Sequence, residues 1–426
     1  MDGLRTLSVL EHEVITIVGS DTEQAIASLD TSGTWLTDTE AQALLRLNDS
    51  RRGFCQRVSG GIKLAQYCGI VRLQTCMLEI LPKIGMEDIR SAQEIERARG
   101  VLLTMLHGAR LTVTASGLAP QQMVRAPLLD IFIEAFLHSA LEQARRGLLC
   151  RYVPHRDNLT VLKGRFHTHG HIRQNLARPH LLHCEYDEFT PNNPYNCAIR
   201  TTLDTCRTWI RRSATQRLWL ETHARYANIT TTNMTSAAVA KLPRNRTTRR
   251  YATVLTWCEW LLSMASPSLS TGFTQAPGLL FDMNKLFEAY VGNQVEAQSS
   301  DAFYVQRQGP AAPLAMMAGD TEAFLLKPDI TVWHATMDGS PTHLSRILDA
   351  KWKRLNPQME NWGVAQADIY QLLAYAIRYQ CAQLELVYPA PSSVMDTTAL
   401  PVFRIATDQS ATSDIQIQIR TMQVWA

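Results

Sequence analysis

Two short apolar segments near the C-terminal end of the chain constrain its fold more than any other feature. Residues 324–333 and 344–352 are rich in apolar side chains and are bounded by turn-forming residues, which predicts two β-strands. The intervening segment 337–341 contains Asp, Gly, Ser and Pro and is typical of a turn. The simplest geometry is therefore a hairpin.

Each predicted strand carries an acidic residue. Asp329 follows a proline in the first strand, and Asp349 and Lys351 lie two residues apart in the second. Because side chains alternate along a strand, Asp349 and Lys351 point to the same face, and pairing of the strands brings Asp329 beside them. Two carboxylates and an ammonium predict a divalent-metal site that suits phosphodiester hydrolysis. The alternative is a salt bridge between Asp349 and a nearby Lys or Arg.

Predicted helices lie on either side of this hairpin in the sequence. The helix expected at 282–292 carries Glu288 outside its apolar stripe, where it is either an ordinary solvated acid or a third carboxylate of the site. The helix expected at 361–380 carries Gln371 and Tyr375 four residues apart, so they share a face. This order of acids and helices along the chain narrows the predicted class of enzyme from any metal-dependent hydrolase to a nuclease.

The overall composition indicates folded domains. Of 426 residues, 46% are apolar and 19% are charged, which predicts roughly two to four domains rather than disorder. The formal net charge is only +3, but basic residues cluster: 145–178 holds eight Lys or Arg and one acid, and 241–250 holds five and none. Either segment suits a phosphate backbone, a protein-docking surface or a solvated face.

Several absences also bear on function. The first residues contain no apolar signal region, and the nine cysteines form no Cys-x-x-Cys pair, so a reduced, cytoplasmic setting is expected. The apolar run 254–265 is interrupted by Glu259 and is too short to span a bilayer of about 30 Å, so no membrane partner is expected. No Gly-Lys dipeptide occurs, and therefore no Walker-A loop, so any nucleotide is hydrolysed by another chain.

The chain is expected to be a multidomain α+β protein. Residues 1–118 are β-rich and suit a partner-docking domain, 119–270 are mainly helical and basic, and 271–426 contain the acidic strands. The boundaries are expected at 116–120 and 266–272, which are rich in Ser, Gly and Pro. Expected elements include a strand or hairpin arm at 6–18, a short helix capped by Thr37 and Glu40, a turn-rich connection at 187–194, and helices at 87–108, 128–147, 196–226 and 251–264.

A histidine-rich segment covers residues 155–183. His167, His169 and His171 alternate and would line one face of a strand, which suggests a zinc site. The spacing matches no common structural zinc module, so a basic, partly exposed strand and loop is the alternative.

The order of these motifs resembles the PD-(D/E)XK nuclease superfamily, and the whole chain is similar to the McrC family, the nuclease subunits of McrBC modification-dependent restriction systems. The phrases that carry the resemblance are LEILPKI at 78–84, DEFT at 187–190 with Asn196 beyond it, MNKLFEAYV at 283–291, KPDI at 327–330, ILDAKW at 347–352 and DIYQLLAY at 368–375. The resemblance implies a restriction-endonuclease-like α/β domain at the C-terminal end. Residues 300–322 and the histidine-rich segment look like elaborations.

The resemblance also implies a division of labour. McrC-like proteins dock on a hexameric AAA+ GTPase, McrB, insert their N-terminal region into its channel and stimulate its GTP hydrolysis. The motor reads and translocates double-stranded DNA containing modified cytosine, and the McrC-like subunit cuts it. Two rival hypotheses are a catalytically silent activator of the motor and a stand-alone RecB-like nuclease.

Roles for individual residues follow from the same resemblance. Asp329 and Asp349 would hold Mg²⁺, and Glu288 would complete the metal shell directly or through water. Lys351 would orient the attacking water or help to deprotonate it. Gln371 and Tyr375 would position the scissile strand or the metal ligands.

Overall fold

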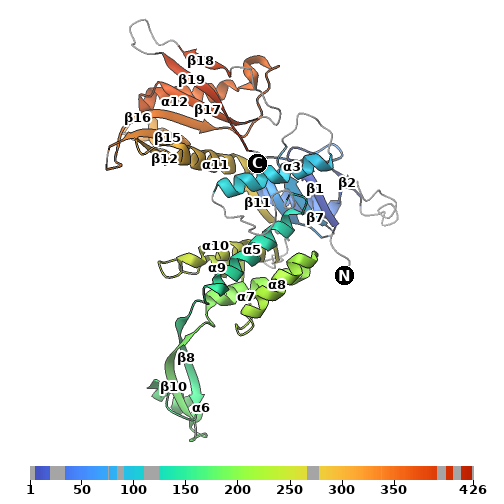
Figure 1. Cartoon of the computed structure of the whole chain (residues 1–426), viewed down its shortest axis with the longest axis vertical. Helices are drawn as coiled ribbons and strands as arrows, with labels where there is room; N and C mark the ends of the chain where they lie inside the picture. The colour runs from blue at the N-terminus through green and yellow to red at the C-terminus, as the bar shows by residue number, and fades with distance from the viewer. Residues whose placement is uncertain are drawn as a thin grey trace. The chain divides into compact units, whose positions relative to one another are not determined.

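The computed structural model describes residues 5–19, 34–74, 76–83, 91–109, 124–265, 278–336, 338–390, 400–405 and 414–424 (Figure 1). The chain forms two compact units. The first contains the described residues of Met1–Thr114, Ala119–Arg125 and Leu280–Ala426, and the second those of Ala115–Leu118 and Ala126–Leu279. The two ends of the chain therefore fold together in one unit, and the middle of the chain forms the other. The boundary segments expected at 116–120 and 266–272 lie outside the described residues.

The N-terminal part of the first unit contains two four-stranded sheets. One has the order β1 (Arg5–Leu10), β7 (Cys76–Leu81), β6 (Tyr67–Arg72) and β11 (Gly278–Asp282), with β1 parallel to β7. The other has the order β3 (Trp35–Thr37), β2 (Val14–Val18), β5 (Gly61–Leu64) and β4 (Cys55–Val58). The arm expected at 6–18 is thus two strands in different sheets, separated by a turn in which His12 has a φ of 65°.

Two helices complete this N-terminal part. Helix α2 (Asp38–Arg46) begins with the predicted capping box, in which Thr37 and Glu40 each bond the other's main chain. Helix α3 (Ala92–Gly108) packs on the β1–β7 sheet, where Arg99 forms a buried ion pair with Glu79 at 2.7 Å. Residues 87–90 of the helix expected at 87–108 lie outside the described part.

The C-terminal part of the first unit is built on a six-stranded mixed sheet. Its order is β12 (Phe303–Arg307), β15 (Ile330–Ala335), β16 (Pro341–Ala350), β17 (Gln383–Pro389), β19 (Ile415–Met422) and β18 (Val402–Ile405). The predicted hairpin is confirmed, because β15 and β16 pair antiparallel. Strands β13 (Ala312–Met317) and β14 (Thr321–Leu326) form a separate pair.

Two helices flank this sheet (Figure 1). Helix α11 (Met283–Gln298) follows β11 directly and is capped by Asp282. Helix α12 (Gln366–Tyr379) packs Leu372 and Tyr375 on the sheet face that carries Ile347, Leu384 and Ile417. This helix begins later than the expected residue 361, because Asn361 and Trp362 adopt positive φ angles that a helix does not accept.

The second unit combines helices with a three-stranded sheet. Its main helices are α5 (Leu128–Arg145), α7 (Pro194–Cys206), α8 (Ser213–Arg225), the short α9 (Ser236–Ala240) and α10 (Ala252–Ala265), with Trp257 in the core. Strands β8 (Arg151–Leu159), β10 (Leu182–Thr190) and β9 (Arg165–Phe166) form the sheet, beside helix α6 (Thr168–Asn175). The middle of the chain thus carries a small sheet in addition to its helices.

Three expectations for this unit were wrong. The single helix expected at 196–226 is two helices, because the backbone becomes extended at Ile210. The turn-rich connection expected at 187–194 begins as strand, since β10 continues to Thr190. The alternating histidines do not line a strand: His169 and His171 lie in α6, and His167 is its N-cap.

Among the described residues, no helix is long and apolar enough to cross a membrane. All nine cysteines are free thiols, and only Cys150 is not fully buried.

Candidate active site

Strands β15 and β16 bring the two predicted aspartates together. Their register pairs Ile330 with Leu348, so one step further along the hairpin Asp329 comes opposite Asp349. The Oδ2 atom of Asp329 accepts a hydrogen bond of 2.9 Å from the main-chain N–H of Ala350. The predicted convergence of these two residues is therefore present in the fold.

Lys351 lies next to Asp349 and joins it to helix α12. Its Nζ is 2.7 Å from Asp349 Oδ2 and donates a 2.9 Å hydrogen bond to Gln371 Oε1. The Gln371 amide donates in turn to the Tyr375 hydroxyl at 2.7 Å, and that hydroxyl donates to the Lys327 carbonyl at 3.3 Å. The structure thus brings together the Lys of one strand and the predicted Gln and Tyr of the helix.

Glu288 reaches the same site from helix α11. Its half-buried carboxylate accepts a hydrogen bond from the Gln308 side chain. Burial raises its pKa, and the negative charge of Asp349 raises it further. The charges of Glu288 and of the two aspartates therefore interact, and Glu288 belongs to the same electrostatic cluster.

The charges of this site are not balanced by the protein alone. Burial, together with the charges of Asp349 and Glu288, raises the pKa of Asp329 to about 8. Burial also raises the pKa of Asp349, although Lys351 opposes the shift. Asp349 is 1% exposed, and its Oδ1 has no hydrogen-bond partner in the described part of the chain. A buried carboxylate oxygen without a partner is costly unless a cation satisfies it.

The donor set fits a hard divalent cation. Asp349, Asp329 and Glu288 supply carboxylate oxygens, which Mg²⁺ prefers, and the raised pKa values indicate room for added positive charge. Within the described ranges, no group of three His, Cys, Asp or Glu side chains is already gathered tightly enough to hold a metal ion. Mg²⁺ usually keeps several water ligands, so a site with fewer protein ligands is sufficient.

Sequence reasoning missed Asp368, an acid that contacts Lys351 and also pairs with Lys353. Asp368, which is 7% exposed, lies 3.6 Å from Lys351 Nζ and 3.0 Å from Lys353 Nζ. Asp368, Gln371 and Tyr375 follow a spacing of three and four residues, which places them on one face of α12. That spacing was the available signal, and it shows that α12 presents an acid as well as an amide to the site.

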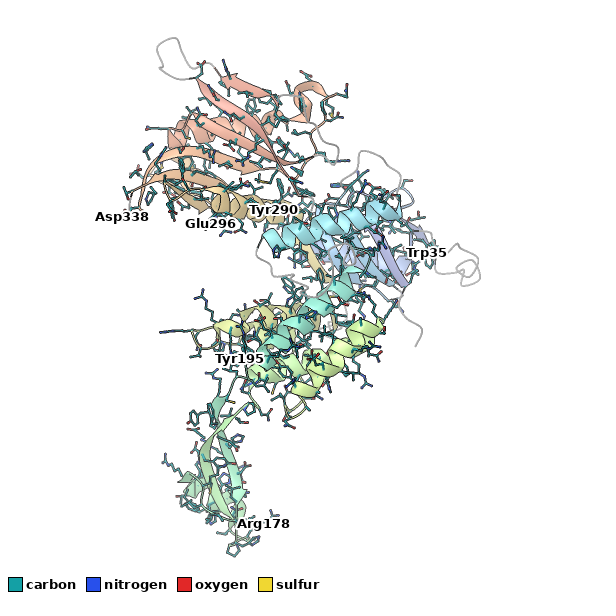
Figure 2. All side chains as sticks on the ribbon, in the orientation of Figure 1. Trp35, Arg178, Tyr195, Tyr290, Glu296 and Asp338 are labelled. Atoms are coloured by element: carbon teal, nitrogen blue, oxygen red, sulfur yellow. The ribbon has the colours of Figure 1, made fainter. Side chains whose placement is uncertain are left out.

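The histidine-rich segment forms a separate polar pocket of about 430 Å³ in the second unit. His167 Nδ1 accepts a hydrogen bond from the Gly170 N–H, and His183 Nδ1 contacts Asn158 Oδ1. The first contact leaves the proton of neutral His167 on Nε2, which opposes metal binding by that atom. Arg178 lies at the tip of the part formed by β8, β10 and α6 (Figure 2).

The two basic segments are partly neutralised by acids. In the first, Arg156 pairs with Glu185 at 2.8 Å and Arg145 with Glu221 at 3.1 Å. In the second, Arg244 pairs with Glu259, and Arg250 donates to the Gly147 carbonyl at 2.7 Å. Neither segment is therefore a row of uncompensated cations.

Fold and site together define an α+β protein with a carboxylate–lysine centre at the ends of two inner strands of a mixed sheet. The family model described as "McrBC 5-methylcytosine restriction system component" matches residues 62–389, and the chain belongs to that family. No curated protein matches the chain.

The solved structures similar to the chain include two from Thermococcus gammatolerans. One is a chain of the refined half-complex from the tetradecameric assembly of Thermococcus gammatolerans McrB AAA+ hexamers with bound McrC. It is 17% identical with a TM-score of 0.64, covering 98% of this chain and 94% of the other, which shows a shared fold. The other is a chain of the Thermococcus gammatolerans McrBC complex, 18% identical with a TM-score of 0.47 over 68% of this chain and 87% of the other.

Proposed function

We propose that this chain is the Mg²⁺-dependent DNA endonuclease subunit of a GTP-driven, modified-cytosine-dependent restriction complex, with a PD-(D/E)XK fold in its C-terminal part. One observation carries the proposal: Asp329, Asp349 and Lys351 converge where β15 begins and β16 ends, and a buried Asp349 oxygen there has no hydrogen-bond partner among the described residues. Membership of a restriction-system family supports DNA as the substrate.

In this proposal the metal is held by Asp349 and Asp329, with Glu288 beside them. When bound, Mg²⁺ supplies charge stabilisation for a phosphodiester and lowers the pKa of a coordinated water. The carboxylates must be ionised to hold it, and because the pKa of Asp329 is raised to about 8, this residue would release a proton at neutral pH when the cation binds.

In the metal-free site Lys351 is a charged donor rather than a base. Burial lowers its pKa, but Asp349, Asp368 and Asp329 outweigh that effect and raise it above the usual value. An ammonium that stays protonated can orient a water or stabilise a phosphate oxygen, but it cannot accept a proton. Gln371 fixes its direction through the 2.9 Å hydrogen bond.

The proposed partner is a McrB-like AAA+ GTPase hexamer, on which this chain docks and whose GTP hydrolysis it stimulates. The lack of a Walker-A loop in this chain supports a separate motor. The similar structure of Thermococcus gammatolerans contains McrB AAA+ hexamers with bound McrC, which supports the same arrangement here. Recognition and translocation of DNA with modified cytosine are assigned to the motor.

The test is co-purification with a McrB-like AAA+ GTPase from the same organism, followed by cleavage of methylated and unmodified DNA with GTP and Mg²⁺. We expect methylation-dependent cleavage that Asp349→Ala abolishes while GTPase stimulation is preserved. Asp338→Ala is the matched control, because Asp338 is exposed in the β15–β16 connection (Figure 2).

Each rival hypothesis has its own outcome in this experiment. Cleavage at the wild-type rate by Asp349→Ala would show that the site is wrongly assigned. An unchanged restriction phenotype in that variant would favour a silent activator of the motor. Robust cutting by the purified chain alone, with Mg²⁺ but without GTP or partner, would favour a stand-alone nuclease.

A further inference from the structure

Trp352 connects the candidate site to the N-terminal sheets. It follows Lys351 in the chain, and its indole Nε1 donates a 2.9 Å hydrogen bond to Glu11 Oε1. Its ring packs on Phe287, with ring centroids 5.4 Å apart, and Phe287 precedes Glu288 on α11. Trp352 therefore follows Lys351 in the chain, packs on Phe287 beside Glu288, and donates to the Glu11 carboxylate near the other end of the sequence.

Glu11 is held firmly where β1 ends. It is 2% exposed, and its main-chain N–H donates to the Leu81 carbonyl at 2.7 Å. Its Oε1 also accepts from the Lys83 N–H at 3.1 Å. Its Oε2 is buried and has no hydrogen-bond partner among the residues described. Burying a carboxylate with an unpaired oxygen costs free energy of folding, and an apolar residue would avoid that cost. The presence of Glu11 here indicates a functional role for its contact with Trp352.

The N-terminal sheets also hold helix α11 directly. Strand β11, at the edge of the β1–β7 sheet, runs into α11, and the Met283 N–H donates to the Gln66 carbonyl at 2.9 Å. Further along the helix, the Asn293 amide donates to the Gly108 carbonyl of α3 at 2.9 Å. The N-terminal part thus fixes the helix that carries Glu288, while Glu11 fixes the segment that carries Lys351.

We propose that Glu11 is a positioning residue for DNA cleavage: by holding the Trp352 indole against Phe287, it sets the position of Lys351 relative to Glu288. This inference rests on the proposed nuclease function. Cleavage geometry is sensitive to small displacements, so a contact that fixes two sides of a site affects turnover without touching substrate. A partner that shifts β1 would therefore alter cleavage through this contact.

Three variants in the complete complex test the role of Glu11. Glu11→Gln keeps the oxygen that accepts from Trp352, so its cleavage rate should stay within about twofold to threefold of wild type. Glu11→Ala and Trp352→Phe remove the hydrogen bond, and we expect each to lower kcat by about tenfold or more with little change in KM. The double variant should lose no more than either single variant, because both remove one contact.

The matched control is Ser8→Ala in β1, the strand that precedes Glu11; it removes a hydrogen bond to Glu79 of β7 without touching Trp352. It should destabilise the N-terminal part but leave kcat unchanged. The Trp352 indole N–H resonance in ¹⁵N-tryptophan-labelled protein, identified by its loss in Trp352→Phe, should shift in Glu11→Ala and change little in Glu11→Gln.

Two failures are distinguishable. A folded Glu11→Ala complex that cleaves at the wild-type rate, or a Ser8→Ala complex as impaired as Glu11→Ala, overturns the positioning role while the nuclease proposal stands. A wild-type complex that cleaves no DNA overturns the proposed function, and the role of Glu11 in cleavage falls with it.

Discussion

Lys351 Nζ lies 2.7 Å from Asp349 Oδ2, yet this pair leaves the site with excess negative charge. Asp329 and Glu288 both have raised pKa values to which Asp349 contributes. An excess of carboxylates over ammonium groups is the electrostatic state expected of a site that is completed by a cation. The first three predictions follow from that imbalance.

Asp329→Asn should stabilise the metal-free protein at neutral pH. The Asn oxygen can still accept from the Ala350 N–H, and the cost of protonating Asp329 on folding at neutral pH, which its raised pKa of about 8 reflects, is removed. The unfolding temperature should rise by about 2–4 °C for each kcal/mol recovered. Scanning calorimetry with a chelator present measures this, and a lower unfolding temperature would contradict the electrostatic assignment.

Mg²⁺ should raise the unfolding temperature of the wild-type chain. A cation that binds only the folded state stabilises it by about 2.7 kcal/mol at a hundredfold excess over Kd. Asp329→Asn and Asp349→Asn should lose most of this effect, whereas Asp338→Asn in the exposed connection should retain it. An equal shift in all four proteins would place the bound cation elsewhere.

Lys351→Met should separate metal binding from cleavage. The substitution keeps the buried stem but removes the ammonium that Asp349 and Gln371 hold, so cleavage should fall about 10²-fold or more. Stabilisation by Mg²⁺ should persist, since the carboxylates remain. Lys353→Met is the control: its side chain is 51% exposed and contacts Asp368, so its loss should cost less than tenfold.

Stability should depend on the ionisation of Glu11. Burial raises its pKa from 4.5 to about 7, so the folded state binds this proton more tightly than the unfolded state does. The contribution is greatest below pH 4.5 and is lost as the pH rises towards 7, by about 3 kcal/mol in total. Urea unfolding at several pH values should show a smaller decline between pH 5 and 7 in Glu11→Gln. Identical slopes would mean that Glu11 ionises normally.

Much of the site was predictable because its geometry is local. Alternation along one strand determines that Asp349 and Lys351 share a face, and a four-residue helical step determines that Gln371 and Tyr375 do. The turn at 337–341 made the hairpin the simplest connection, and its register placed Asp329 opposite Asp349. The capping box at Thr37 and Glu40 is local in the same sense.

Other features depend on contacts between distant segments. The composition of residues 196–226 did not reveal that the helix breaks at Ile210, because tertiary packing overrides the weak helix propensity of the segment. The arm at 6–18 divides between two sheets, since β1 pairs with β7 some seventy residues away. No periodicity within either segment encodes such a pairing.

The sequence by itself determined which groups could perform the chemistry: two aspartates, a lysine, and an amide and a hydroxyl at fixed local spacings. Only the tertiary structure decided how these groups are charged and held. The raised pKa values come from burial between β16, α11 and α12, and the contact of Trp352 with Glu11 joins residues 341 positions apart. Burial and long-range contacts are properties of the packed chain, so local spacing could not reveal them.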